Sequence, residues 1–408
     1  MTVSIERLGH HGDGIAPGPV YVARTLPGEV VSGAVEGDRI TRPKVVTPSP
    51  DRIAAPCPHY RNCGGCALQH ASDHFVANWK ISVVRAALAA QGLDAPIRGI
   101  ATSPPRSRRR ATLHGRRLKG GPMVGLHGRA SGSLVAVPDC RVLTPGILAG
   151  MTAFEALTVI AASRKSEVDL AVTDTESGLD VALSGAFPLD SERRVAAARI
   201  AARHDLARLT WNGEPVAEQR APVVRFGPVT VTPPPAAFLQ ATREGEAALL
   251  SAVTEALGAV EAVVDLFAGC GTFALPLSRS TAVHAVEGGA DLLAALDHGW
   301  RHAEGVRRVT TEARDLFRNP LRPDELGRFD AAVIDPPRAG AQAQTEALAA
   351  SSVSRIASVS CNPASFARDA RILAEAGFRL DWVQVVDQFR WSPHVELAAA
   401  FVRDHIRR

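Results

Sequence analysis

A single cysteine, Cys361, stands in the segment VSCNPASFARD, after a short apolar run and directly before Asn-Pro. Such a cysteine can be a packing residue, a metal ligand or a nucleophile, because its thiolate both binds metals and attacks electrophilic carbon. The apolar run predicts a buried strand, and strand ends of an open α/β sheet face the ligand crevice. If a group-transfer cofactor binds in that crevice, we favour the nucleophile over packing.

A glycine-rich turn in VVDLFAGCGTFALPL predicts such a cofactor site. Gly269 begins a G-x-G-x-x-A run between a strand pattern and a helix pattern, a turn that brings backbone close to a nucleotide. Glu287 ends the next strand pattern and is placed to hydrogen-bond a ribose diol. Asp265, four residues before Gly269, is typical of S-adenosylmethionine methyltransferases rather than of dinucleotide dehydrogenases. The alternative is a tight turn that binds no ligand.

Another carboxylate, Asp335 in VIDPPRAG, follows a later strand pattern and should lie in the same crevice. An aromatic residue after Asp-Pro-Pro would indicate an amino-group methyltransferase, in which it stacks on the target base. Arg338 stands there instead, which argues against that class.

The chain has six cysteines, of which Cys57, Cys63 and Cys66 lie close together in CPHYRNCGGC. A disulfide framework is not expected in a cytosolic chain of this length, so this group predicts a metal site. Cys270 lies within the glycine-rich turn, where we expect it to pack.

The net charge is only +4, but basic residues concentrate in PPRSRRRATLHGRRLKG (104–120). Such a run is either a solvated face or a surface that binds nucleic-acid phosphates. We find no stretch long enough to cross a membrane and no apolar signal-peptide core at the amino terminus. We therefore expect a cytoplasmic protein that does not bind membranes. We also expect the protein to be a monomer.

The pattern of elements predicts three domains. Short alternating strands with glycine-rich turns predict a small β-barrel over residues 1–55. Residues 56–235 predict a mixed α+β domain that contains the cysteine group, a helix within 74–92 and the basic segment. Residues 236–408 alternate strands with helices, which predicts a doubly wound, Rossmann-like α/β sheet.

Taken together, SCNPASFARD, DPPRAG, DLFAGCGTF, PPPAAFLQ and SPHVEL resemble the RNA uracil-C5 methyltransferases. The amino-terminal segment resembles a TRAM domain, an OB-like RNA-binding barrel. CPHYRNCGGCALQH with VPDC resembles the iron–sulfur segment of the 23S rRNA members, the RlmD (RumA) type. The resemblance covers nearly the whole chain, whereas the tRNA-acting relatives resemble it only in the catalytic part.

The resemblance implies a class I methyltransferase domain, S-adenosylmethionine as methyl donor and a [4Fe–4S] cluster. It implies Cys361 as the nucleophile and Glu396 as the base, with His394 a weaker candidate for the base. The cofactor-binding residues that it implies, together with the turn, are Gln240, Phe267, Gly269, Thr272, Glu287, Asp315 and Asp335. The cluster ligands that it implies are Cys57, Cys63, Cys66 and Cys140, although four thiolates also suit zinc. Phe238 stacks on a base or on the cofactor, or packs in the core.

In the implied chemistry, a thiolate adds to carbon 6 of uracil, and carbon 5 of the resulting enolate takes the methyl group. The RNA partner that we expect is 23S rRNA, reached with its target base out of the stack and its backbone on the basic segment. The alternatives are a tRNA uridine methyltransferase, an RNA-binding protein without catalysis, and a zinc-ribbon nucleic-acid protein.

Overall fold

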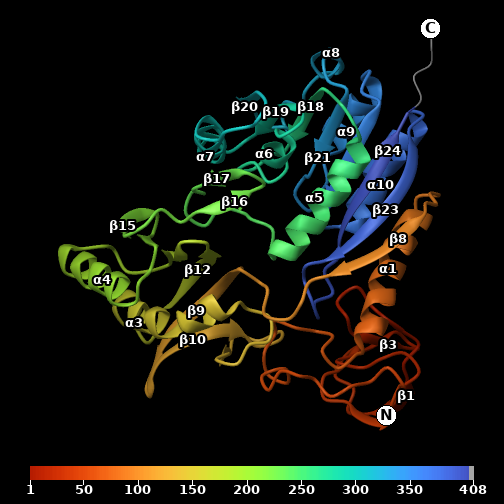
Figure 1. The fold of residues 1–408 in the computed structure, drawn as a ribbon. Coiled ribbons are helices and arrows are strands. Elements are labelled where there is room, and N and C mark those ends of the chain that lie inside the picture. The colour runs from red at the N-terminus through yellow and green to blue at the C-terminus, as the bar shows by residue number, and fades with distance from the viewer. Residues whose placement is uncertain (404–408) are drawn as a thin grey trace.

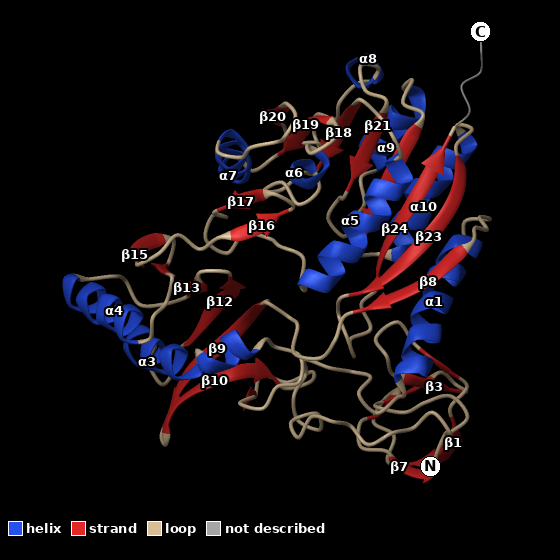
Figure 2. Ribbon diagram, in the orientation of Figure 1, coloured by secondary structure: helices blue, strands red, loops and turns tan. Residues whose placement is uncertain are grey.

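The computed structural model of the protein describes residues 1–403. Figures 1 and 2 show the amino-terminal strands, a central sheet with its helices, and a larger carboxyl-terminal sheet covered by helices. None of the helices within residues 1–403 combines the length and the apolar character that a membrane crossing requires.

The carboxyl-terminal sheet has eight strands, and its order is that of a doubly wound fold. In spatial order they are β20 (Val309–Ala313), β19 (Ala282–Glu287), β18 (Ala262–Leu266), β21 (Ala331–Ile334), β22 (Arg355–Ser360), β24 (Glu396–Val402), β23 (Arg379–Asp387) and β8 (Ile97–Thr102). The chain builds outwards from β18 in both directions, so the switch point lies between β18 and β21. Strands β20 to β22 run parallel, whereas β24 is antiparallel to both of its neighbours.

Helices cover both faces of this sheet, because successive residues of its buried strands point to opposite sides. Val263 packs into the core on one face and Val264 into the core on the other. The first face is covered by α5 (Arg243–Leu257), α6 (Ala274–Leu277) and α7 (Ala290–Arg301). The second face is covered by α1 (Asp73–Ala89), α8 (Pro323–Leu326), α9 (Gln342–Ala350) and α10 (Pro363–Glu375).

The structure differs from the predicted domain boundary at residue 236 in one respect. Helix α1 and strand β8 belong to the carboxyl-terminal sheet rather than to the central domain, and Figure 1 shows both in orange beside the blue β23 and β24. The apolar stripe of α1 that contains Val84 and Leu88 packs on the second face. Its fully buried Lys80 lies 2.5 Å from the Asp387 carboxylate at the end of β23, a pairing of distant segments that periodicity alone cannot show.

The central region forms a seven-stranded mixed sheet that lies apart from the larger one (Figure 2). Its spatial order is β11 (Leu134–Ala136), β10 (Gly121–His127), β9 (Arg110–Leu118), β12 (Glu167–Thr175), β13 (Gly178–Ser184), β14 (Arg208–Trp211) and β15 (Glu214–Glu218). Its core also includes residues of α2 (Pro145–Ala149), α3 (Met151–Ala161) and α4 (Ser191–Arg203). A hairpin of β16 (Val224–Phe226) and β17 (Val229–Val231) leads into the carboxyl-terminal domain.

The amino-terminal segment folds as two small sheets. One contains β1 (Thr2–Ser4), β5 (Val30–Ser32) and β7 (Lys44–Thr47), and the other β2 (Arg7–Leu8), β3 (Gly14–Ala16), β4 (Val20–Val22) and β6 (Arg39–Ile40). Buried Asp13 of this module forms an ion pair with Arg129 of the central region, which ties the two together.

Candidate active site

The glycine-rich turn lies where β18 ends, at the switch point of the sheet. Phe267, Gly269 and Gly271 all have positive φ angles, of 65°, 55° and 101°, and a side chain is strained in that region. A Cβ added at Gly269 would meet no atom within 4 Å, so the backbone of this residue borders open space. The turn therefore has the backbone geometry and the room for the close approach of a nucleotide-like cofactor.

Glu287, at the end of β19, is held by this turn. Its carboxylate accepts the N–H of Gly269 at 3.0 Å and the N–H of Gly289 at 2.9 Å. Thr272 is half-buried in the same turn. The structure therefore brings four of the predicted cofactor residues together, namely Phe267, Gly269, Thr272 and Glu287.

The rim of this site contains an aromatic residue that sequence reasoning missed. The ring of Phe317 lies 5.4 Å from the ring of Phe267, and its side chain is 52% exposed. Asp315 is exposed beyond β20 and accepts the N–H groups of Phe317 and Arg318. Asp315 thus shapes the turn that presents Phe317, and ring proximity of this kind is not visible in the sequence.

Two carboxylates at the switch point lack a cationic partner within residues 1–403. Asp265 is fully buried, its oxygens have no hydrogen-bond partner there, and burial raises its pKa to about 8. Burial, followed by the charges of Glu396 and Asp265, raises the pKa of Asp335 well above its usual range. A cofactor with a sulfonium and an ammonium group would stabilise both carboxylates, so these residues fit S-adenosylmethionine.

Cys361 and Glu396 meet at the same edge of the sheet. Antiparallel pairing ends with Ser360 of β22 opposite Leu397 of β24. Cys361 directly follows Ser360 and Glu396 directly precedes Leu397, and the two side chains are near enough for the charge of Glu396 to raise the pKa of Cys361. Because β24 is antiparallel, its first residue lies at the edge where the parallel strands end. This pairing is the structural reason why residues far apart in sequence share one pocket.

The electrostatics of this pair are those of a resting thiol beside a titratable carboxyl group. Burial, reinforced by the charges of Glu396 and Asp335, raises the pKa of Cys361 to about 11, while Arg338 opposes the rise. Burial raises the pKa of Glu396 to about 7, and a hydrogen bond from Gln388 opposes that rise. A carboxyl group with this pKa is suited to take up a proton near neutral pH.

The positive charge of Arg338 leads to a prediction that needs no substrate. Replacing Arg338 by Leu removes the one cation that lowers the pKa of Cys361, so its thiolate fraction should fall. We expect alkylation of Cys361 by iodoacetamide to slow by about threefold or more, as measured by peptide mass spectrometry. Arg371→Leu, which removes an exposed arginine paired with Glu375 on α10, is the matched control. An unchanged rate in the Arg338 variant would show that this cation does not act on the thiol.

Gln240 lies with Cys361 and Glu396 rather than at the glycine-rich turn. Its amide nitrogen faces the Asp335 carboxylate at 3.5 Å, and its amide oxygen accepts a hydrogen bond of 2.6 Å from Gln388. The predicted cofactor residues therefore divide into two groups. The charges of Asp265 and Glu396 both raise the pKa of Asp335, which places Asp335 between the two groups.

The basic segment is only in part the free surface that its sequence suggested. Arg109 is buried, with its guanidinium 2.5 Å from Glu246, and Arg108 lines a cavity beside the cysteines. The Arg110 guanidinium lies 4.6 Å from the ring of Phe238, which is 62% exposed and therefore not a core residue. The prediction that the whole segment contacts phosphates was therefore wrong for Arg108 and Arg109, since buried Arg109 pairs with a carboxylate of the catalytic domain.

The four cysteines predicted to bind a metal line one cavity of about 180 Å³, together with Tyr60, Gln69 and Arg108. Within residues 1–403, no three of their sulfur atoms lie within 4.8 Å of one another. Four thiolates around one zinc ion would lie about 3.8 Å apart, given a Zn–S bond of about 2.3 Å. The described thiols are therefore not arranged as four ligands around one zinc ion. Cys270 is buried elsewhere, in the glycine-rich turn.

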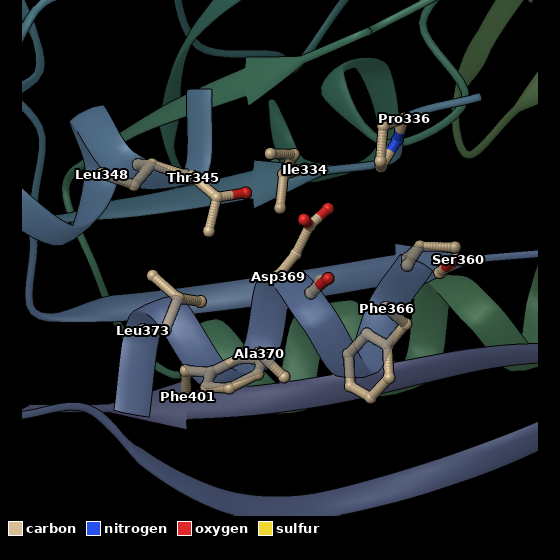
Figure 3. Close-up of a pocket in the computed structure, with 12 residues that line it drawn as sticks. Ile334, Pro336, Thr345, Leu348, Ser360, Phe366, Asp369, Ala370, Leu373 and Phe401 are labelled. Atoms are coloured by element: carbon tan, nitrogen blue, oxygen red, sulfur yellow. The ribbon is translucent and has the colours of Figure 1, made fainter. Parts of the chain in front are cut away.

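Two other features do not form a ligand site. His114, His127 and Glu167 lie close together, but the imidazoles stack in parallel and Glu167 already pairs with Arg116, which is the geometry of a surface ion-pair network. A void of about 10 Å³ lies between β21, β22, α9 and α10. Figure 3 shows the side chains that line it. Its carboxylate, Asp369, already accepts the N–H of Ala341, so this void is a packing defect with room for about one water molecule.

Comparison with known proteins agrees with this geometry. The family described as tRNA (Uracil-5-)-methyltransferase matches residues 302–403. An RNA methyltransferase of Brucella suis is 42% identical over 98% of this chain and 97% of its own length. The 23S rRNA (uracil(1939)-C(5))-methyltransferase RlmD of Chromohalobacter salexigens is 32% identical over 98% of this chain and 89% of its own length.

The fold also matches a solved structure over nearly its full length. The tRNA (uracil-54, C5)-methyltransferase of Pyrococcus abyssi, solved with S-adenosyl-L-homocysteine, has a TM-score of 0.76 and covers 98% of this chain and 99% of that one, at 20% identity. At that identity the match concerns the fold alone. Its extent shows that the expectation of a resemblance to tRNA-acting relatives only in the catalytic part was wrong for the fold. The extent of the match to the curated relatives, together with the cofactor geometry above, shows that the chain belongs to the family of S-adenosylmethionine-dependent RNA uracil-C5 methyltransferases.

Proposed function

We propose that the protein methylates carbon 5 of one uridine of 23S rRNA through a covalent bond between Cys361 and carbon 6 of the base. The observation that supports this proposal is that Cys361 and Glu396 lie at the same edge of the sheet, where both act electrostatically with Asp335. The 32% identical relative is named for this reaction on 23S rRNA. The family description, which names tRNA, supports tRNA as the second candidate substrate.

The chemistry follows from the residues of the pocket. S-adenosylmethionine, when bound, supplies an electrophilic methyl group. The half-exposed Cys361 thiol loses its proton to water and adds as a thiolate to carbon 6, and the electron pair of the ring moves to carbon 5. Carbon 5 would form the new bond to the methyl carbon while the bond between that carbon and the sulfonium sulfur breaks, with S-adenosyl-L-homocysteine as the leaving group. Glu396 then takes the proton from carbon 5, the carbon–sulfur bond breaks, and the thiolate is released. Glu396 must be a carboxylate for this last step, which a pKa of about 7 permits.

Purified protein tests the proposal directly. Incubated with labelled S-adenosylmethionine, it should place 5-methyluridine in 23S rRNA taken from cells that lack the gene, and not in their tRNA. Label in tRNA alone would preserve the chemistry and overturn the substrate. Label at another position of the base in either RNA would overturn the proposal.

We further propose that Cys57, Cys63, Cys66 and Cys140 hold a [4Fe–4S] cluster with a structural role, since methyl transfer requires no electron. The cavity that the four cysteines share supports a common site, and the described thiols are not gathered as closely as four ligands of one zinc ion would be. We also propose that residues 1–55 act as a TRAM-like RNA-binding barrel and that exposed Arg106, Arg117 and Lys119 contact the RNA backbone.

The metal assignment predicts a coloured protein. Anaerobically purified protein should absorb near about 400 nm, with iron and sulfide in equal amounts, and Cys63→Ser with Cys140→Ser should abolish that absorbance. Cys270→Ser, which changes a cysteine outside the cavity, should retain it. A colourless protein with stoichiometric zinc would contradict the assignment, because zinc is d¹⁰.

A further inference from the structure

We propose that Gln388 is a positioning residue that fixes the Glu396 carboxylate and the Gln240 amide at the same time. This inference rests on the proposed function, because it assigns Glu396 the work of a base. Gln388 directly follows β23, is 2% exposed, and was not singled out by sequence reasoning.

The Gln388 amide makes three hydrogen bonds, which use its oxygen and both of its N–H groups. Its oxygen accepts the backbone N–H of Ala241 at 2.7 Å, and since that N–H can only donate, the orientation of the amide is determined. Its nitrogen therefore faces the two remaining partners, Oε1 of Gln240 and Oε2 of Glu396, each at 2.6 Å. Because Oε1 of Gln240 is an acceptor here, the NH₂ of Gln240 faces Asp335. One amide thus sets the direction of two other side chains.

The backbone on both sides of Gln388 is itself fixed. The buried Lys80 ammonium of α1 donates to the Asp387 carboxylate at 2.5 Å and to the Phe389 carbonyl at 3.3 Å. At the start of α5, a Cβ on Gly245 would lie 2.6 Å from Cβ of Gln388, so only glycine leaves room for this side chain. Gln388 therefore has little freedom to move away from Glu396.

The hydrogen bond from Gln388 favours the charged form of Glu396. Burial raises the pKa of Glu396, and Gln388 limits that rise. The other titratable groups that sense Glu396 are Asp335 and Cys361, and neither supplies a positive charge. Without Gln388, the carboxyl group would be more protonated at neutral pH and less able to take the carbon 5 proton.

The experiment measures how fast the covalent RNA–protein adduct resolves as a function of pH. In the wild-type protein the rate should rise as pH increases through about 7, because only the carboxylate accepts the proton. In Gln388→Leu the same rise should occur at a pH higher by about one unit or more, so that resolution is slow at pH ~7 and recovers at pH ~9. Gln384→Leu removes a glutamine within β23 whose amide donates to the backbone carbonyls of Gly99 and Val385, and its profile should match the wild type.

A second variant keeps the test decisive if Gln388→Leu folds poorly. Gln388→Glu retains an acceptor for Ala241 but places a carboxylate next to Glu396, so its shift to higher pH should exceed that of the Leu variant. Rates that fall equally at every pH, with no shift in either variant, would overturn the positioning role. The proposed function fails in a different way: Cys361→Ala would then still methylate RNA at the wild-type rate.

Discussion

Replacing Cys361 by Ala should lower methyl transfer by at least about 10⁴-fold, the loss expected when a covalent nucleophile is removed. Carbon 5 of uracil is a weak nucleophile until a group adds at carbon 6. Among the described residues, four of the other cysteines line the separate cavity and Cys270 is buried in the glycine-rich turn, so Cys361 is the cysteine on which the charge of Glu396 acts. Transfer of a labelled methyl group from S-adenosylmethionine to RNA measures the loss.

The control for this variant is its affinity for the cofactor. Cys361 is not part of the glycine-rich turn to which Glu287 is hydrogen-bonded. The dissociation constant of S-adenosylmethionine, measured by calorimetry, should therefore change by less than about threefold. Cys361→Ser should be nearly as inactive as Cys361→Ala, because a serine hydroxyl remains protonated where a thiol can ionise. Activity within about 100-fold of the wild type in the Ala variant would exclude covalent catalysis by this residue.

The second large effect is expected from Glu396→Gln. An amide has the shape of the carboxyl group but cannot accept the proton, so reaction should stop after methyl transfer with RNA still joined to Cys361. We expect a shifted band on denaturing gels, formed only with S-adenosylmethionine present, and turnover reduced by about 10³-fold or more.

Two controls identify the trapped species. Glu375→Gln changes an exposed carboxylate of α10 and should form no stable adduct while keeping wild-type turnover. The double variant with Cys361→Ala should lose the band. If turnover is lost without an adduct, Glu396 acts before the covalent step, and another group removes the proton.

Much of the carboxyl-terminal sheet could be predicted from the sequence. The patterns AVVDLF and AVHAVE correspond to β18 and β19, and the glycine-rich turn lies between β18 and the first helix that follows. Local signals suffice there, because each βα unit is adjacent in sequence and parallel strands buried on both faces are nearly continuously apolar.

Contacts between distant segments could not be predicted in this way. Strand β8 joins the sheet beside β23, and Lys80 pairs with Asp387. The periodicity of each segment predicts its own element but not the partner segment that it contacts. Gln388 was missed for the same reason, because its partners are distant in sequence. Ala241 lies just before α5, and Glu396 is the first residue of β24. The prediction that the basic segment contacts phosphates was wrong for Arg109, because composition shows the charge of a segment but not its partners. Arg109 forms an ion pair with Glu246.

The central claim is that this protein makes 5-methyluridine in 23S rRNA with Cys361 as its nucleophile. The most direct measurement is nucleoside mass spectrometry of separated rRNA and tRNA from cells lacking the gene, complemented with the wild-type or the Cys361→Ala protein. We predict that 5-methyluridine disappears from 23S rRNA and returns with the wild-type protein but not with Cys361→Ala. Full restoration by Cys361→Ala, or unchanged 5-methyluridine in both RNAs of the deletion strain, would contradict it.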